Sequence, residues 1–117
     1  MSDTVVIKAG ELRDYIELEQ QVVVPDDGGG SSTTYVPVEG VWAKVTPISS
    51  YESTVLAQRG IEASHSVKLR FYDGLDATWR LKFDGRYMAI VSVMDVQERQ
   101  RAMLLKVVER KGKEDDA

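Results

Sequence analysis

Few residues of this 117-residue chain belong to types that carry out chemistry, and they lie far apart in the sequence. The chain has one histidine, His65, and no cysteine. The lack of cysteine excludes disulfides and thiolate metal sites, and a single histidine cannot build a histidine-rich metal cage. His65 could serve as a general base, because imidazole titrates near neutral pH. It begins an alternating segment on the apolar side, which predicts an ordinary residue at a strand end.

A run of three glycines, Gly28, Gly29 and Gly30, invites comparison with a phosphate-binding loop. A Walker loop requires a lysine followed by serine or threonine after its last glycine, at the entrance to a helix. Here Gly30 is followed by serines and threonines, and no helical pattern comes after them. Glycine and serine runs supply mainly flexibility, so the sequence predicts a mobile hairpin tip in place of a nucleotide site.

Adjacent acids, Asp26–Asp27 and Glu114–Asp115–Asp116, are the candidates for acid–base catalysis. A catalytic carboxylate needs a fixed, desolvated setting that moves its pKa toward the working pH. Both groups fall in stretches predicted to be a loop and a polar tail, where carboxylates are solvated. No serine stands in a nucleophile-elbow motif. We therefore predict that the protein is not an enzyme, with no catalytic residue, cofactor or metal.

Three aromatic residues, Trp42, Tyr72 and Trp79, could form a stacking face for single-stranded nucleic acid, as on an oligonucleotide-binding barrel. Such a face normally lies in a basic groove, and the formal net charge of the chain is −4. The charge favours packing of these rings in the core or at its rim. A nucleic-acid-binding small β-barrel remains the alternative hypothesis.

The length and composition are those of one soluble domain, residues 1–117, with 43% apolar and 29% charged residues. We expect an ordered core over residues 10–109 and a flexible tail over residues 110–117. No apolar run approaches the ~20 residues that cross a bilayer, so no membrane is expected as a partner. The start, MSDTVVIKAG, has an acid and lacks a basic leader, so we expect synthesis in the cytoplasm without a signal peptide.

Alternation of apolar and polar residues predicts an all-β fold, a small antiparallel barrel or sandwich of about six strands. Asp84–Gly85 is a strong signal for a two-residue hairpin, because both residues accept positive φ. The strand that follows it is apolar on both faces, which predicts a central strand covered on both sides. A long flexible loop is expected over residues 26–34. The predicted strands are residues 14–24, about 35–47, 65–72, 79–83, 86–93 and 102–109.

One short helix is expected at about residues 50–59. Ser49 and Glu52 have the spacing of a capping box, in which a hydroxyl and a carboxylate bind the free amides of a helix start. Gly60 stands where a C-terminal glycine cap belongs. The predicted helix has few apolar residues, so much of its surface must face water or a partner.

The succession of these landmarks resembles the head–tail joining (head-closure) family of tailed bacteriophages. The resemblance extends over nearly all of residues 10–109. The most specific part is the order of Trp-Ala-Lys, then Glu52, then Arg70, then the hairpin with Gly85-Arg86-Tyr87. The matching stretches are GELRDYIELEQ (10–20), DDGGG (26–30), VWAKVTPISSYE (41–52), residues 58–62, HSVKLRFYDGL (65–75) and RLKFDGRYMAIVSVMD (80–95).

The resemblance implies a structural virion protein that acts as an adaptor or stopper. It implies a homo-oligomeric ring, a dodecamer in the virion, that lies below the portal and joins a DNA-filled capsid to the tail. The implied partners are the portal or an adaptor protein and tail-completion or tail-tube proteins, and packaged DNA passes through the lumen without specific binding. Such rings can await a partner platform, so we expect a monomer in solution.

Two segments are expected to make the contacts of assembly, because loops and thinly packed helices can become ordered on binding. The first is the predicted loop and the second is the region of the short helix, residues 49–62. The candidate interaction residues are Asp27, Gly28, Gly29, Gly30, Tyr51, Glu52, Gln58 and Arg59.

Overall fold

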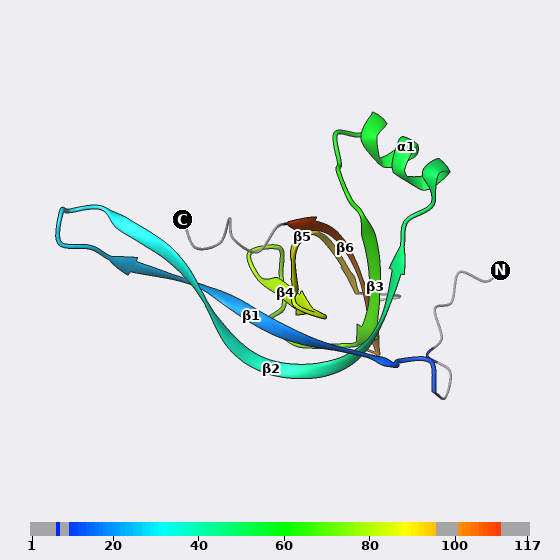
Figure 1. Ribbon diagram of the computed structural model, residues 1–117, viewed down its shortest axis with the longest axis horizontal. Helices are drawn as coiled ribbons and strands as arrows, with labels where there is room; N and C mark the ends of the chain where they lie inside the picture. Colours follow the sequence, from blue (N-terminus) through cyan, green and yellow to red (C-terminus); the bar gives the residue numbers. More distant parts are fainter. Residues whose placement is uncertain (1–6, 8–9, 96–100, 111–117) are drawn as a thin grey trace.

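The computed structural model describes residue 7, residues 10–95 and residues 101–110. Six strands form a closed antiparallel barrel in the order β1-β2-β3-β6-β5-β4 (Figure 1). The predicted all-β class is confirmed. Of the two predicted architectures, barrel and sandwich, the structure has the closed barrel. No helix within the described ranges is long and apolar enough to cross a membrane. The elements are β1 (Asp14–Pro25), β2 (Ser31–Pro47), α1 (Ser50–Gln58), β3 (His65–Arg70), β4 (Arg80–Phe83), β5 (Arg86–Asp95) and β6 (Ala102–Arg110).

One continuous core fills the barrel, because alternate residues point inward where a strand lies in the barrel wall and no bulge interrupts it. The 71–79 connection between β3 and β4 adds Leu75 and Trp79, which are both buried. The Asp84–Gly85 hairpin is confirmed: both residues have positive φ, 54° and 76°. The largest fully buried side chains are Ile16, Leu18, Val67, Leu69, Leu81, Met88, Leu105 and Val107.

The prediction that β5 is covered on both faces is wrong. Met88 and Ile90 point into the core, and the register with β6 then shifts between Ile90 and Ser92. This bulge reverses the alternation, so Val93 packs against the core and Val91 is left 37% exposed. The apolar residues on both sides of the sequence pattern therefore reflect a bulge in a strand with one buried face.

The loop predicted over residues 26–34 is shorter than expected. Residues 31–34 belong to β2, and only residues 26–30 form the turn between β1 and β2. The carboxylate of Asp26 accepts hydrogen bonds from the amides of Gly28 (2.9 Å) and Gly30 (3.0 Å). The amide of Asp26 also donates to the carbonyl of Gly30 (3.0 Å). These bonds gather the glycine run into a compact turn, which lets the serines and threonines pair as a strand.

Helix α1 agrees with its predicted ends. The Ser49 hydroxyl accepts a hydrogen bond from the amide of Glu52 (3.1 Å). Gly60 has φ 78°, and the amides of Gly60 and Ile61 donate to Ala57 and Leu56, the pattern of a Schellman cap. The Glu52 carboxylate binds Lys106 Nζ (2.5 Å), so it ties the helix to β6. Of the predicted tail, Arg110 belongs to β6 and residues 111–117 lie outside the described residues.

We expect Gly60→Ala to destabilise the end of α1 by about 1–2 kcal/mol, the cost of a left-handed conformation for an L-residue. The measurement is hydrogen exchange at the Gly60 and Ile61 positions, which should lose protection while the amides of β6 keep theirs. Gly28→Ala is the matched control, because its φ is not in the left-handed region. Equal loss of protection in β6 would contradict the separation of α1 from the barrel core.

Candidate assembly surfaces

The predicted interaction residues lie in two projections that are far apart (Figure 1). The turn with Asp27 and the glycines is the tip of a long β1–β2 hairpin that extends away from the barrel. Helix α1 stands off the barrel on the opposite side, between the end of β2 and the start of β3. The structure therefore keeps both predicted segments at the surface and does not bring them together.

The first projection, called the arm here, comprises residues 20–36. Beyond Glu19, β1 pairs with β2 alone among the described strands, and β2 meets β3 only from Ala43 onward. The arm is thus a two-stranded ribbon with both outer edges unpaired within the described part of the chain. An isolated ribbon is marginally stable in water. Val23 is 60% exposed, and Val24 and Val36 are also exposed, which is typical of a surface that a partner covers.

A cluster at the base of the arm fixes its direction, and sequence analysis missed it. Arg80 of β4 binds Glu19 of β1 through Nε (2.6 Å), and both side chains are largely buried. The Arg80 guanidinium also lies over the rings of Tyr35 (4.3 Å to the centroid) and Tyr87 (4.1 Å). Tyr35 belongs to the arm, so this stack joins the arm to the barrel wall. The four residues are far apart in the sequence and no local motif connects them.

The second projection is α1, in which none of the nine residues is buried. Tyr51 is 80% exposed, and Gln58 and Arg59 are exposed as well. These three predicted residues are therefore accessible to a partner. Glu52 differs, because its carboxylate is engaged by Lys106 and helps to hold the helix. Its role in this structure is attachment of α1.

Trp42, Tyr72 and Trp79 do not form one stacking face, because Trp79 is buried; Trp42 and Tyr72 line a common hollow of about 280 Å³ together with Arg70. Trp79 is buried and meets Tyr72 edge to face, with centroids 5.9 Å apart. Trp42 points outward from β2 and is 57% exposed. It meets the 52%-exposed Tyr15 of β1 in an edge-on contact at 5.2 Å. Core or rim packing is confirmed for Trp79, whereas Trp42 belongs to an outer surface.

Trp42 and Tyr15 are the centre of what we call the aromatic–basic patch, which crosses the outer faces of β1, β2 and β3. Tyr15 of β1 pairs with Trp42 of β2. Ala43, the residue after Trp42, pairs with Leu69 of β3, and the exposed Arg70 comes directly after Leu69. Lys44 lies two residues along β2, and exposed Arg13 precedes β1. The patch is therefore Arg13, Tyr15, Trp42, Lys44 and Arg70.

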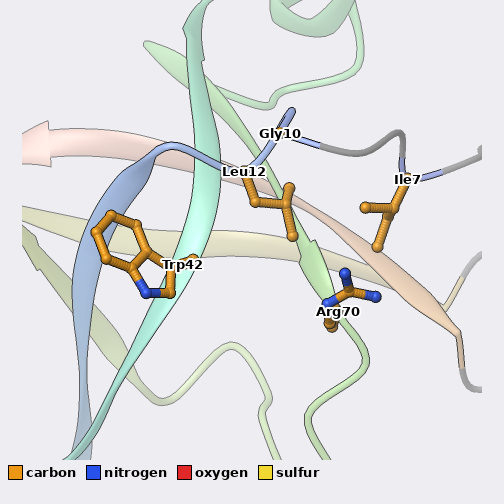
Figure 2. Close-up of a pocket in the computed structure, with 5 residues that line it drawn as sticks. All are labelled: Ile7, Gly10, Leu12, Trp42 and Arg70. Atoms are coloured by element: carbon orange, nitrogen blue, oxygen red, sulfur yellow. The ribbon is translucent and has the colours of Figure 1, made fainter.

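A hollow of about 210 Å³ adjoins the patch. Figure 2 shows Trp42, Leu12, Ile7 and Arg70 around this space. The volume far exceeds the ~10–15 Å³ that one water molecule needs, so aliphatic side chains of a partner could enter it. The alternation of β2 predicted that Trp42 and Lys44 share a face. That residues of β1 and β3 lie on the same surface depends on how these strands pair with β2, which the sequence pattern does not give.

Gly40 makes room for the aromatic pair, because a Cβ atom at this position would overlap the Tyr15 hydroxyl. We expect Gly40→Ala to push Tyr15 off Trp42, to lower the free energy of unfolding by about 1 kcal/mol, because the 52%-exposed Tyr15 ring can turn outward and mainly the aromatic contact is lost, and to shift the Trp42 emission. Urea denaturation and tryptophan fluorescence measure these effects. Tyr15→Ala removes the obstacle, so Gly40→Ala should be nearly neutral in that background. An equal cost in both backgrounds would contradict this explanation.

His65, the candidate general base, makes contacts that join two strands. His65 Nδ1 lies 2.9 Å from Ser64 Oγ, and this oxygen accepts a hydrogen bond from the amide of Glu109 (2.8 Å). The pair thus connects the start of β3 to the end of β6, as expected for a strand-end histidine. Tyr72 donates a hydrogen bond to Glu39 (2.9 Å), which raises the pKa of Tyr72. Within the described ranges, no three histidine or acidic residues are grouped so as to hold a metal ion.

A closed barrel with two exposed projections and an exposed aromatic patch defines a protein that acts through surface contacts, an assembly subunit. Residues 7–110 match the phage head completion protein family. The chain belongs to this family and is a structural component of a virion. No curated protein was found with a similar sequence.

Solved structures with a similar fold include the following two. The solution structure of protein SF1141 from Shigella flexneri 2a matches with a TM-score of 0.71 and 24% identity, over 92% of this chain and 99% of that one. A chain in the virion of a native gene transfer agent particle matches with a TM-score of 0.58 and 17% identity, over 85% and 96%. At these identities the likeness establishes the fold alone.

Proposed function

We propose that the protein is a ring-forming connector at the head–tail joint of a tailed phage. It assembles as a dodecamer below the portal, as an adaptor or stopper, and joins the portal or an adaptor protein to tail-completion or tail-tube proteins. It is made in the host cytoplasm and enters the virion on assembly. Family membership supports the virion role, and the surfaces of the barrel support the ring.

The observation that carries the proposal is the presence of two different projections, the arm and α1, on one rigid barrel. A closed ring uses heterologous contacts, in which one surface of a subunit meets a different surface of the next. The arm supplies one such surface and the barrel wall of the next subunit the other, which leaves α1, on the opposite side, for a portal or tail partner; the closed barrel holds these surfaces at a fixed spacing. The net charge of −4 suits a lumen that repels DNA phosphates and lets the duplex pass without specific binding.

Shortening the arm tests the proposal. Residues 23–24 pair with residues 32–33, so removing both pairs of residues takes out two paired rows, keeps the 26–30 turn and leaves every remaining side chain on its own face. The arm becomes about 7 Å shorter. We expect thermal unfolding of the barrel to change little, because these residues lie outside it. Head–tail joining, counted by electron microscopy in a complementation assay, should fall at least about tenfold, since a truncated arm cannot reach its contact.

The matched control replaces Ser31 and Ser32 by alanine, which alters the arm without shortening it. This control should join heads to tails normally. Normal joining by the shortened variant, with the protein present in the particles, would contradict a role for the arm. Absence of the protein from particles formed by the unmodified chain would contradict the proposed function itself.

A further inference from the structure

The arm tip and the aromatic–basic patch have complementary chemistry. The arm carries two carboxylates, Asp26 and Asp27, and no lysine or arginine anywhere in residues 20–36. Its exposed apolar residues, Val23 and Val24, lie just before the turn. The patch offers Arg13 and Arg70 around two exposed aromatic rings, whereas Lys44 is already paired with Glu11 (3.6 Å), and the overall charge of the chain is negative. Opposite charge around apolar contacts gives both register and attraction at an interface.

The patch has the composition of an energetic centre of a protein interface. Tryptophan, tyrosine and arginine dominate such centres; here Tyr15 contacts Trp42, and Arg70 lines the same hollow as Trp42, with Leu12 between them (Figure 2). The hollow next to Trp42 is bounded by Leu12 and Ile7, which are half-buried apolar residues. A valine side chain of an inserted hairpin would contact Leu12 and Ile7, while the polar part of the lining, which includes Arg70, would meet a carboxylate of the tip.

The tip and the patch of one copy cannot meet. Both lie on β1 and β2, where Tyr15 pairs with Trp42 and Pro25 with Ser31. Ten residues of strand from Tyr15 to Pro25 separate them by about 33 Å. The Arg80 stack and the barrel hold the base of the ribbon, so it cannot fold back onto its own outer face. The occupant of the patch is therefore a separate molecule.

We propose that the arm tip of one copy docks on the aromatic–basic patch of the next copy. The contact is heterologous, because it joins two different surfaces, and it propagates around a ring until the ring closes. The inference rests on the proposed ring function, for which it names the contacting residues. Asp27 would lie at the cationic rim near Arg70, with the 60%-exposed Val23 against Trp42.

Engineered cysteines test this contact, because the natural chain has none. The double variant Asp27→Cys with Arg70→Cys should yield a ladder of cross-linked multimers when assembled particles are oxidised and run on a non-reducing gel. Each single variant should stop at dimers at most. The matched control, Asp27→Cys with Ser53→Cys on α1, should also stop at dimers, since Ser53 is not a patch residue and α1 approaches the patch only where Glu52 lines a hollow with Lys44.

The outcomes separate the inference from the proposed function. A ladder from the 27–70 pair supports arm-to-patch docking. Particles that contain the protein and give no ladder, or a ladder from the α1 control alone, overturn it. Particles that never contain the unmodified protein overturn the proposed function instead.

Two substitutions give a second, independent readout. Trp42→Ala should lower incorporation into particles at least about thirtyfold, the effect of removing an interface hot spot, while lowering the free energy of unfolding by only about 1 kcal/mol, because the 57%-exposed Trp42 loses mainly its contact with Tyr15. Thr46→Ala, on the same strand outside the patch, is the control. Arg70→Glu and Asp27→Lys should each weaken assembly by up to about fivefold per contact, and their combination should restore it.

Binding of DNA is the competing role of a basic, aromatic surface. If Trp42→Ala abolishes a salt-sensitive gel shift of a short DNA oligomer and the charge-reversed pair fails to restore assembly, the patch binds nucleic acid and the docking proposal is wrong. We expect no gel shift by the unmodified protein at physiological salt. We also expect full recovery in the charge-reversed pair.

Discussion

Truncation of Leu105 to alanine is expected to lower the free energy of unfolding by about 3–5 kcal/mol. Leu105 is fully buried in β6, between β3 and β5, and belongs to the single core of the barrel. The substitution removes apolar burial and leaves a cavity that a closed wall of hydrogen-bonded strands cannot collapse to fill. Urea unfolding followed by tryptophan fluorescence measures the loss.

Leu104→Ala is the matched control, since Leu104 is the preceding residue of β6 and is only partly buried. It should cost well under half as much as Leu105→Ala. Equal costs at the two positions would show that β6 does not have one inward face, and the barrel topology would be in conflict with the measurement.

The second large effect is expected at the base of the arm. Removing Arg80 leaves the Glu19 carboxylate buried without its cation, and breaking a buried ion pair in this way costs about 3–5 kcal/mol. Arg80→Met also abolishes the stacking on Tyr35 and Tyr87, which should free the arm at its base. Thermal unfolding reports the stability, and the relaxation of arm amides in NMR reports the mobility.

The double variant Glu19→Gln with Arg80→Met separates the two effects. It has no buried charge, so it should recover much of the lost stability, because an uncharged pair of similar volume can replace a buried ion pair. The arm should stay mobile, since the stacking is still absent. Additive losses in the double variant, or an arm that stays rigid without Arg80, would contradict the role assigned to this cluster.

Local patterns in the sequence predicted the parts of the fold that depend on neighbouring residues. Alternation identified the strands, because the side-chain period of a strand is two residues. Ser49 identified the start of α1, because its hydroxyl accepts a hydrogen bond from the first turn. Gly60 and Asp84–Gly85 identified the end of α1 and a hairpin, because these residues accept positive φ. These features need no information from distant residues.

The predictions that were wrong or missing concern features that depend on residues far away in the chain. The length of the arm is set by where β4 and β3 stop pairing with the hairpin, which alternation cannot reveal. The bulge at Val91 reverses the alternation of side chains in β5, which is why the sequence of this strand is apolar on both faces. Arg80 and Glu19 are brought together by the barrel register alone. The glycine run is a local signal, so it predicted the turn at the tip of the arm. The patch around Trp42 joins three strands, so the sequence pattern did not predict it.

The most direct test of the central claim, a rigid barrel that works through its arm, is a cryo-electron microscopy reconstruction of the head–tail joint. The account predicts a closed ring of this protein in which the tip of each arm lies against Trp42 and Arg70 of the adjacent subunit. A ring held together by the barrel walls, with the arms extending freely into solvent, would contradict it.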